Sequence, residues 1–306
     1  MAGTILEPGQ IEAAASTPPF ILLPPRDLFA LRAERFDKLA ADHALGDYLR
    51  LLAGVCRAQQ QVLDNPPQLA PLDERRTREC LTHDLPPLAT DTLVREGHWL
   101  PMLDAWLDAF EAPANNPSVS AALEQLRQAD AGQRTAWAIA LLSGQYDSLP
   151  AALVPFLGAS LQLAWSHWRL QFDMSEFKER EDQTLCPCCG APAMAGVIRH
   201  LGKVNGLRYL ICSVCALEWH YVRLKCSYCR STKKLDYLHL EGSPHGVKAE
   251  VCPQCNSYLK QLYLELDAEG ECLSADLATL DLDLLLAEQG HLRQAPNLLL
   301  APGGGE

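Results

Sequence analysis

The chain has 306 residues and a formal net charge of −12 at neutral pH. Its apolar fraction of 48% and charged fraction of 21% are typical of a folded globular protein with one large domain or two ordinary ones. The acidic balance argues against a protein that mainly coats nucleic acid or an anionic membrane.

The first 19 residues are expected to be a flexible N-terminus. They lack the basic segment followed by an apolar core that defines a signal peptide. No uninterrupted apolar run in the sequence approaches the ~18 residues that a membrane span needs. We therefore expect a cytoplasmic protein, in which clustered cysteines are more often metal ligands or redox groups than disulfides.

Residues 20–182 are predicted to form an all-helical domain. Apolar residues that recur at three- and four-residue intervals are the pattern of amphipathic helices. This pattern occurs in the segments 28–40, 48–62, 92–110, 119–128, 132–142 and 151–172. The last of these carries apolar residues on a second face as well, so we expect it to be the central helix. No alternating strand pattern precedes residue 185, and the charged segment 175–182 is predicted to be a linker.

The cysteines are concentrated in the second half of the chain. Nine of the 12 fall between Cys186 and Cys255, and eight of those nine form Cys-x2-Cys pairs. Adding 40 to each cysteine of the first two pairs gives the cysteines of the last two, and Gly206 falls on Gly246 in the same way. This constant offset indicates a tandem repeat of the unit Cys-x2-Cys-x22-Cys-x2-Cys.

Two Cys-x2-Cys knuckles can present four thiolates to one metal ion. The repeat predicts site 1 from Cys186, Cys189, Cys212 and Cys215, and site 2 from Cys226, Cys229, Cys252 and Cys255. A tetrahedral shell of four sulfurs suits zinc and mononuclear iron alike, with zinc as the default. The segments GVIRHL, LRYLIC, LDYLHL and VKAEVC between the knuckles have the character of short strands. Crossed pairing of the knuckles stays open at this point.

Eight lysines and arginines lie between Arg199 and Lys234, with Glu218 as the one acid among them. A nucleic-acid-binding ribbon has this pattern. We favour the alternative that the basic side chains offset the charge of two metal sites, about −2 each, and donate hydrogen bonds to sulfur.

Two cysteines of the second half lie outside the pairs. Cys188 is either an exposed redox thiol or a side chain with no role in the chemistry, and Cys272 is interpreted as structural. The sequence contains no phosphate loop, dinucleotide fingerprint or nucleophile elbow, which lowers the odds of an enzyme.

Several stretches resemble the FdhE family of formate dehydrogenase accessory proteins, from about residue 20 to about residue 300. They are ILLPPRDLFALRAERFDKLA, GDYLRLLAGVCRAQ, RYLICSVCALEWHYVRLKCSYC, AEVCPQCNSYLKQLYLE and ADLATLDLDLLLAEQG. The resemblance implies a non-enzymatic cytoplasmic maturation factor whose partner is the catalytic subunit of respiratory formate dehydrogenase. It also implies rubredoxin-like sites, which moves the expected metal from zinc towards iron, with two mononuclear four-cysteine sites in each chain.

The expected fold class is α+β in two parts. An all-helical N-terminal domain is followed by two tandem rubredoxin- or zinc-ribbon-like modules with short antiparallel strands, at residues 183–222 and 223–268, and by a short C-terminal helix and tail at residues 269–306. Between the two sites, the family-signature residues Glu218, Trp219, His220, Arg223 and Lys225 are expected to form a surface displayed to the partner. The open alternatives are a homodimer, a nucleic-acid-binding zinc ribbon, and a thiol redox protein that acts through Cys188.

Overall fold

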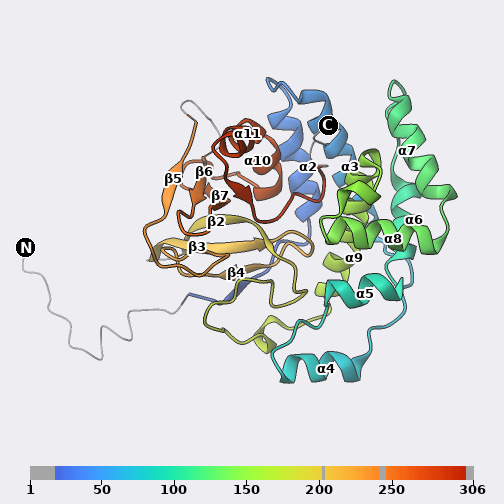
Figure 1. Ribbon diagram of the computed structural model, residues 1–306. Helices are drawn as coiled ribbons and strands as arrows, with labels where there is room; N and C mark the ends of the chain where they lie inside the picture. Colours follow the sequence, from blue (N-terminus) through green and yellow to red (C-terminus); the bar gives the residue numbers. More distant parts are fainter. Residues whose placement is uncertain (1–17, 202–203, 241–245, 301–306) are drawn as a thin grey trace, which may run out of the picture.

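The computed structural model describes residues 18–201, 204–240 and 246–300. A helical region and a sheet region lie side by side, as the sequence predicts (Figure 1). The helices are α2 (Leu28–Leu39), α3 (Gly46–Asp64), α4 (Glu74–Thr82), α5 (Thr90–Glu96), α6 (Leu100–Ala109), α7 (Pro117–Gln128), α8 (Ala131–Leu142), α9 (Val154–Arg169), α10 (Cys272–Leu277) and α11 (Leu280–Glu288). No helix within these described ranges is both long and apolar enough to cross a membrane.

The helix predictions are confirmed with two exceptions. The segment 92–110 is two helices, α5 and α6, because Gly97 adopts a φ of 72° and ends the first helix in the left-handed conformation. Helix α4 was not predicted because it buries none of its residues, so no apolar stripe marks it in the sequence. Both differences arise where the periodic pattern is interrupted or absent.

Helix α9 is the central helix of the N-terminal region, as its two apolar faces predict. Every one of its residues except His167 is buried. It packs against α3, α6 and α8, and Phe156 near its start joins an aromatic cluster with Trp106 and Phe110. A helix is buried on all sides when other elements pack around it. Besides the other helices, the sheet region packs against α9.

The two repeat units form one continuous sheet. Its strands run in the order β1-β4-β3-β2-β7-β6-β5, with β8 beside β7. Their bounds are β1 Ile21–Leu22, β2 Ala193–Leu201, β3 Val204–Cys212, β4 Glu218–His220, β5 Asp236–Leu238, β6 Val247–Val251, β7 Ser257–Tyr263 and β8 Leu292–Arg293. Within each unit the strands are antiparallel, as expected. The units meet at a parallel seam, where β2 pairs with β7.

The N-terminal region is helical, as predicted, and it also contributes one two-residue strand that the prediction does not include. Ile21 of β1 pairs with Trp219 of β4, and the carbonyl of Phe20 accepts a hydrogen bond of 2.8 Å from the amide of His220. A strand of two residues is too short to show an alternating pattern. The lead-in to the first helix therefore forms the edge of the first repeat unit.

The C-terminal segment returns from the sheet to the helices. The single helix expected there is two short helices, α10 and α11, and the following residues pack against α9. A Cβ atom on Gly158 of α9 would lie 2.0 Å from the carbonyl oxygen of Leu298, so only glycine permits this approach. The Tyr48 hydroxyl of α3 donates to the carbonyl of Leu299. The end of the chain thus binds the two regions together.

A buried group of charges holds α10 to the sheet. Asp276 of α10 accepts hydrogen bonds from Arg293 (2.6 Å) and Asn297 (3.0 Å), and the ammonium of Lys260 on β7 lies 3.2 Å from it. Burial alone would raise the pKa of Asp276, but the charges of Arg293 and Lys260 outweigh it and hold the pKa at about 2. This carboxylate is therefore ionised across the whole physiological range.

Candidate metal centres

All four Cys-x2-Cys knuckles close in the same way. The amide of each first cysteine donates to the carbonyl five residues later, at 2.9 Å in every case: Cys186 to Ala191, Cys212 to Leu217, Cys226 to Ser231 and Cys252 to Ser257. The residue after each second cysteine has a positive φ, namely Gly190, Ala216, Arg230 and Asn256. Gly206 and Gly246 also share a positive φ at equivalent positions. The 40-residue repeat is therefore a repeat of backbone conformation as well as of sequence.

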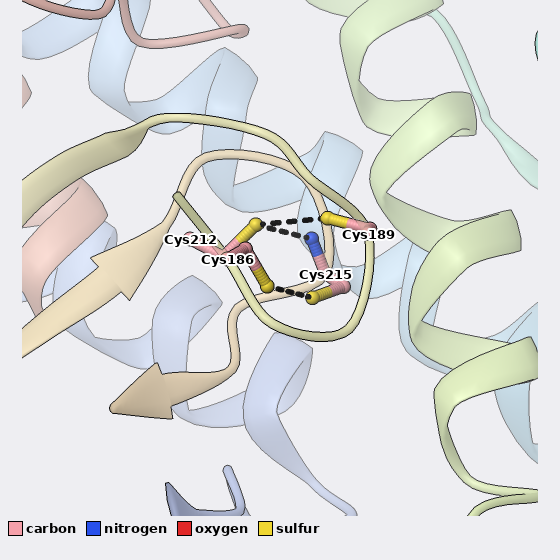
Figure 2. A group of neighbouring side chains, drawn as sticks. All are labelled: Cys186, Cys189, Cys212 and Cys215. Carbon is pink, nitrogen blue, oxygen red and sulfur yellow. Dashed lines mark hydrogen bonds between the residues drawn. The ribbon is translucent and has the colours of Figure 1, made fainter. Parts of the chain in front are cut away.

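The structure brings the eight cysteines together in the two groups of four that the repeat predicts. In site 1 the Sγ atoms of Cys186 and Cys215 are 3.6 Å apart, and those of Cys189 and Cys212 are 3.3 Å apart. Figure 2 shows the four side chains converging from two facing loops. All four cysteines of this site are buried.

Site 2 has the same arrangement but lies nearer the surface. Its Sγ atoms are 3.8 Å apart between Cys226 and Cys255, and 3.7 Å apart between Cys229 and Cys252. Cys229 is exposed and Cys255 is half-buried, whereas no cysteine of site 1 is accessible. Site 2 is therefore more accessible to water and solutes than site 1.

The sulfur spacing fits a tetrahedral metal ion. Metal–sulfur bonds of about 2.3 Å place tetrahedral sulfurs about 3.8 Å apart, close to the separations in both sites. Backbone amides point at the sulfurs: Cys212 Sγ accepts from Val214 (3.3 Å) and Cys215 (3.4 Å), and Cys226 Sγ accepts from Tyr228 (3.4 Å). Such amides stabilise thiolate ligands. Four protein ligands leave no open position for bound water or substrate, so each site suits a structural or electron-transfer ion.

The helical region holds the loops of site 1 in place. The carbonyl of Cys188 accepts a hydrogen bond of 2.9 Å from the amide of Leu88, and the Leu88 carbonyl accepts one of 2.8 Å from the indole of Trp165. Gln162 donates to the carbonyl of Ser213 at 3.0 Å, inside the second knuckle. Gln162 of α9 thus holds the second loop directly, and Trp165 holds the first loop through Leu88. Site 1 is part of the main hydrophobic core.

The structure excludes an exposed redox thiol at Cys188. Its side chain is completely buried in the main core, and the adjacent Cys215 together with burial raises the pKa of its thiol well above the usual value. A reactive thiol needs the opposite conditions. Cys272 is buried at the start of α10, where burial raises its pKa, in keeping with a structural role.

Two of the residues expected on a displayed surface are buried. The Trp219 side chain is inaccessible, and its indole donates to the carbonyl of Gln183 at 2.8 Å. Glu218 is buried too and accepts two hydrogen bonds of 2.7 Å from Arg199. The prediction is wrong for these residues because their strand, β4, lies between β1 and β3 and has neighbours on both sides. Their role is to build the first unit.

The remaining three residues lie closer to solvent. His220 is partly exposed with its Nδ1 atom 3.6 Å from Glu179, Arg223 is exposed, and Lys225 forms an ion pair with Asp182. These three residues belong to the segment that connects the two sites. The same segment carries apolar residues that are not among the family-signature residues.

Three large apolar side chains stand exposed beside site 2. Val222, Leu224 and Tyr228 expose 60%, 70% and 64% of their surfaces. Arg223 and Arg230, both exposed, lie among them in the sequence. We call these five residues the bridge surface. The sequence signal for it is the run of alternating apolar and basic residues, which resembles a strand but forms none.

Beneath the bridge surface lies a buried ion pair. Arg208 of β3 faces Glu250 of β6, with its Nη1 atom 2.5 and 2.6 Å from the two carboxylate oxygens. Its Nη2 atom donates to the carbonyls of Val222 (2.7 Å) and Lys225 (2.5 Å). Burial raises the pKa of Glu250, and the Arg208 charge opposes that shift. This arginine links both units to the connection between them.

Among the described residues, the predicted hydrogen bonds from these basic side chains to the sulfurs are not formed, so that part of the interpretation is wrong. Arg199 and Arg208 pair with carboxylates, as does Lys225. Within the described ranges, no lysine or arginine side chain donates a hydrogen bond to any of the eight sulfurs, which are served by backbone amides and by Ser257. The pairing also leaves less free positive charge for a nucleic acid than the sequence suggests.

Comparison with known proteins identifies the family. Three family models match, described as "FdhE, N-terminal" (residues 17–182), "FdhE, central domain" (185–223) and "FdhE, C-terminal domain" (224–300). The chain is 78% identical to an FdhE homolog of Stutzerimonas stutzeri, covering 99% of both chains. It is 35% identical to protein FdhE of Escherichia coli, covering 94% of this chain and 93% of that one.

A solved structure agrees with these matches. The crystal structure of the FdhE protein from Pseudomonas aeruginosa superimposes with a TM-score of 0.89 at 60% identity, covering 94% of this chain and 100% of that chain. The similarity includes the helical region, the sheet and both cysteine clusters, since the family models span all of them. The chain belongs to the FdhE family.

Proposed function

We propose that this protein is a cytoplasmic, non-enzymatic accessory factor that binds the immature catalytic subunit of respiratory formate dehydrogenase and is needed for its activity. Membership of the FdhE family carries this proposal. The two closed four-sulfur sites support it, because neither has an open position at which a metal could act on a substrate. A protein with two closed metal sites is expected to act by binding a partner through its surface.

The bridge surface is the region that we assign to the partner. Monomeric proteins rarely expose several large apolar side chains together unless the patch binds something. Val222 and Leu224 are exposed on either side of Arg223 in the sequence. Protein interfaces are enriched in tyrosine and arginine, and the bridge surface contains both. The surface adjoins site 2, because Tyr228 and Arg230 flank the site 2 residue Cys229 in the sequence.

The binding test uses the full chain with Val222→Ser and Leu224→Ser combined. Burial of an exposed leucine or valine contributes about 1.5–3 kcal/mol, and each ~1.4 kcal/mol changes affinity tenfold. We expect recovery of the catalytic subunit in a pull-down to fall at least tenfold while metal content is unchanged. Leu284→Ser is the matched control, because Leu284 is 68% exposed on α11 and does not belong to the bridge surface. Equal recovery by all three proteins would contradict the assignment.

We propose that both sites hold iron, with zinc as the alternative. The sulfur geometry accommodates either ion, and the family resemblance favours iron. The test is the metal content and visible spectrum of protein purified without oxygen. Two irons per chain with a reducible absorption band support the proposal. Two zinc ions per chain would contradict it and make the sites structural.

A further inference from the structure

A charged side chain of the helical region is buried without a hydrogen-bond partner on two of its nitrogens. Arg169, the last residue of α9, is 2% exposed. In the part of the chain that the structure describes, its Nε and Nη1 atoms have no hydrogen-bond partner and it forms no ion pair with a carboxylate. A buried charge without a counter-charge costs several kcal/mol. Within the described residues, the guanidinium thus lacks the carboxylate partner that a buried arginine usually has.

The neighbouring contacts of α9 show what Arg169 faces. Residues seven apart on a helix share a face, and Gln162, seven residues earlier, donates to the carbonyl of Ser213 in the second knuckle of site 1. Trp165, between them, holds the loop that binds Cys188. This face of α9 thus contacts the second loop of site 1 directly and the first loop through Leu88.

The sulfurs around site 1 are the charges that act on this arginine. Burial lowers the pKa of the Arg169 guanidinium, and the charges of Cys215, Cys188, Cys186 and Cys212 oppose that effect. Three of these four cysteines belong to site 1, and Cys188 lies within its first knuckle. The guanidinium is therefore close enough to the site to sense its charge.

We propose that Arg169 is the counter-charge of site 1 and couples metal occupancy to the docking of α9. A divalent ion with four thiolates has a net charge of about −2, which compensates the guanidinium. Loss of the metal leaves the buried guanidinium without this compensation. The role rests on metal binding at site 1, which belongs to the proposed function, but not on the identity of the partner. Arg169 touches no substrate and is a positioning residue.

Redox behaviour follows from the same charge if the ion is iron. Four thiolates give a net charge of about −2 with ferrous iron and about −1 with ferric iron. A fixed positive charge favours the more negative, reduced state. Arg169 therefore raises the reduction potential of site 1 above the value expected for Arg169→Met.

The test is metal release from the full-length, zinc-loaded protein into excess chelator, followed as the zinc–chelator complex forms. The wild-type protein should release one equivalent quickly from exposed site 2 and one slowly from site 1. In Arg169→Met the slow phase should accelerate at least tenfold with the fast phase unchanged. Arg169→Lys, which keeps the charge, should restore most of the slow phase.

Control variants separate charge from packing and from general stability. Lys260 is buried to a similar degree but pairs with Asp276 and Asp283 rather than with a group of site 1, so Lys260→Met should destabilise the fold without selectively accelerating the slow phase. An unchanged slow phase in Arg169→Met, or equal acceleration in Arg169→Lys or Lys260→Met, would overturn the proposal. A wild-type chain that retains no slowly released metal would overturn metal binding at site 1, and the role of Arg169 with it.

Discussion

Arg208 is the residue whose replacement should disturb the connection between the two sites most. It holds the Glu250 carboxylate and two bridge carbonyls, Val222 and Lys225, at 2.5–2.7 Å. Arg208→Met keeps most of the side-chain volume and removes the charge and all the hydrogen bonds. Glu250 then stays buried with only Tyr237 (3.2 Å) and Gln261 (3.1 Å) as side-chain donors.

The expected loss is about 4 kcal/mol in the free energy of unfolding, since removal of one partner from a buried ion pair typically costs about 3–5 kcal/mol. The Arg208 and Glu250 side chains meet this condition, being 0% and 4% exposed. Urea unfolding of the zinc-loaded chain measures this loss as a fall in the midpoint at constant slope. The bridge should also become sensitive to proteases, because its carbonyls lose their anchor.

Two variants test the reasoning. Arg57 and Asp37 form an ion pair at a similar distance, 2.7 Å, but are 57% and 47% exposed, so Arg57→Met should cost less than about 1 kcal/mol. Replacement of both buried partners, Arg208→Met with Glu250→Leu, should recover most of the loss because no unpaired charge is left. A loss below about 1 kcal/mol for Arg208→Met alone would refute the role assigned to this arginine.

Three further predictions concern the metal sites, pH and the chain end. Because site 2 is accessible and site 1 is buried, a chelator at limiting concentration should remove one metal equivalent first, and mass spectrometry should show that Cys229 has become reactive to alkylation while Cys189 has not. Asp276, with a pKa of about 2 when folded and 3.8 as the ordinary value, contributes on the order of 2 kcal/mol above pH ~4. That contribution is lost as pH falls from about 4 to about 2, and Asp276→Asn should flatten acid unfolding in this window. Gly158→Ala places a methyl group against the Leu298 carbonyl, so it should lower stability by about 1–3 kcal/mol and release the C-terminal segment to carboxypeptidase; an unaltered digestion pattern would argue against this contact.

The sequence by itself determined the local features of this protein. The spacing of the cysteines sets each knuckle, because the closing hydrogen bond and the left-handed residue lie within five residues of one another. The 40-residue offset predicts the two groups of four cysteines, and the structure confirms them over the crossed pairings that the sequence leaves open. The sequence also predicts long helices from their apolar stripes, as for α3 and for α9, which has apolar residues on two faces.

Only the tertiary structure decided which residues face solvent, metal or protein. Trp219 and Leu224 lie five residues apart in one signature, yet the first is buried between strands and the second is exposed. Arg208 and Arg169 look like ordinary charges in the sequence, but one is paired with a strand of the other unit and one is buried beside site 1. Burial and pairing depend on neighbours far away along the chain, and no local pattern encodes those neighbours.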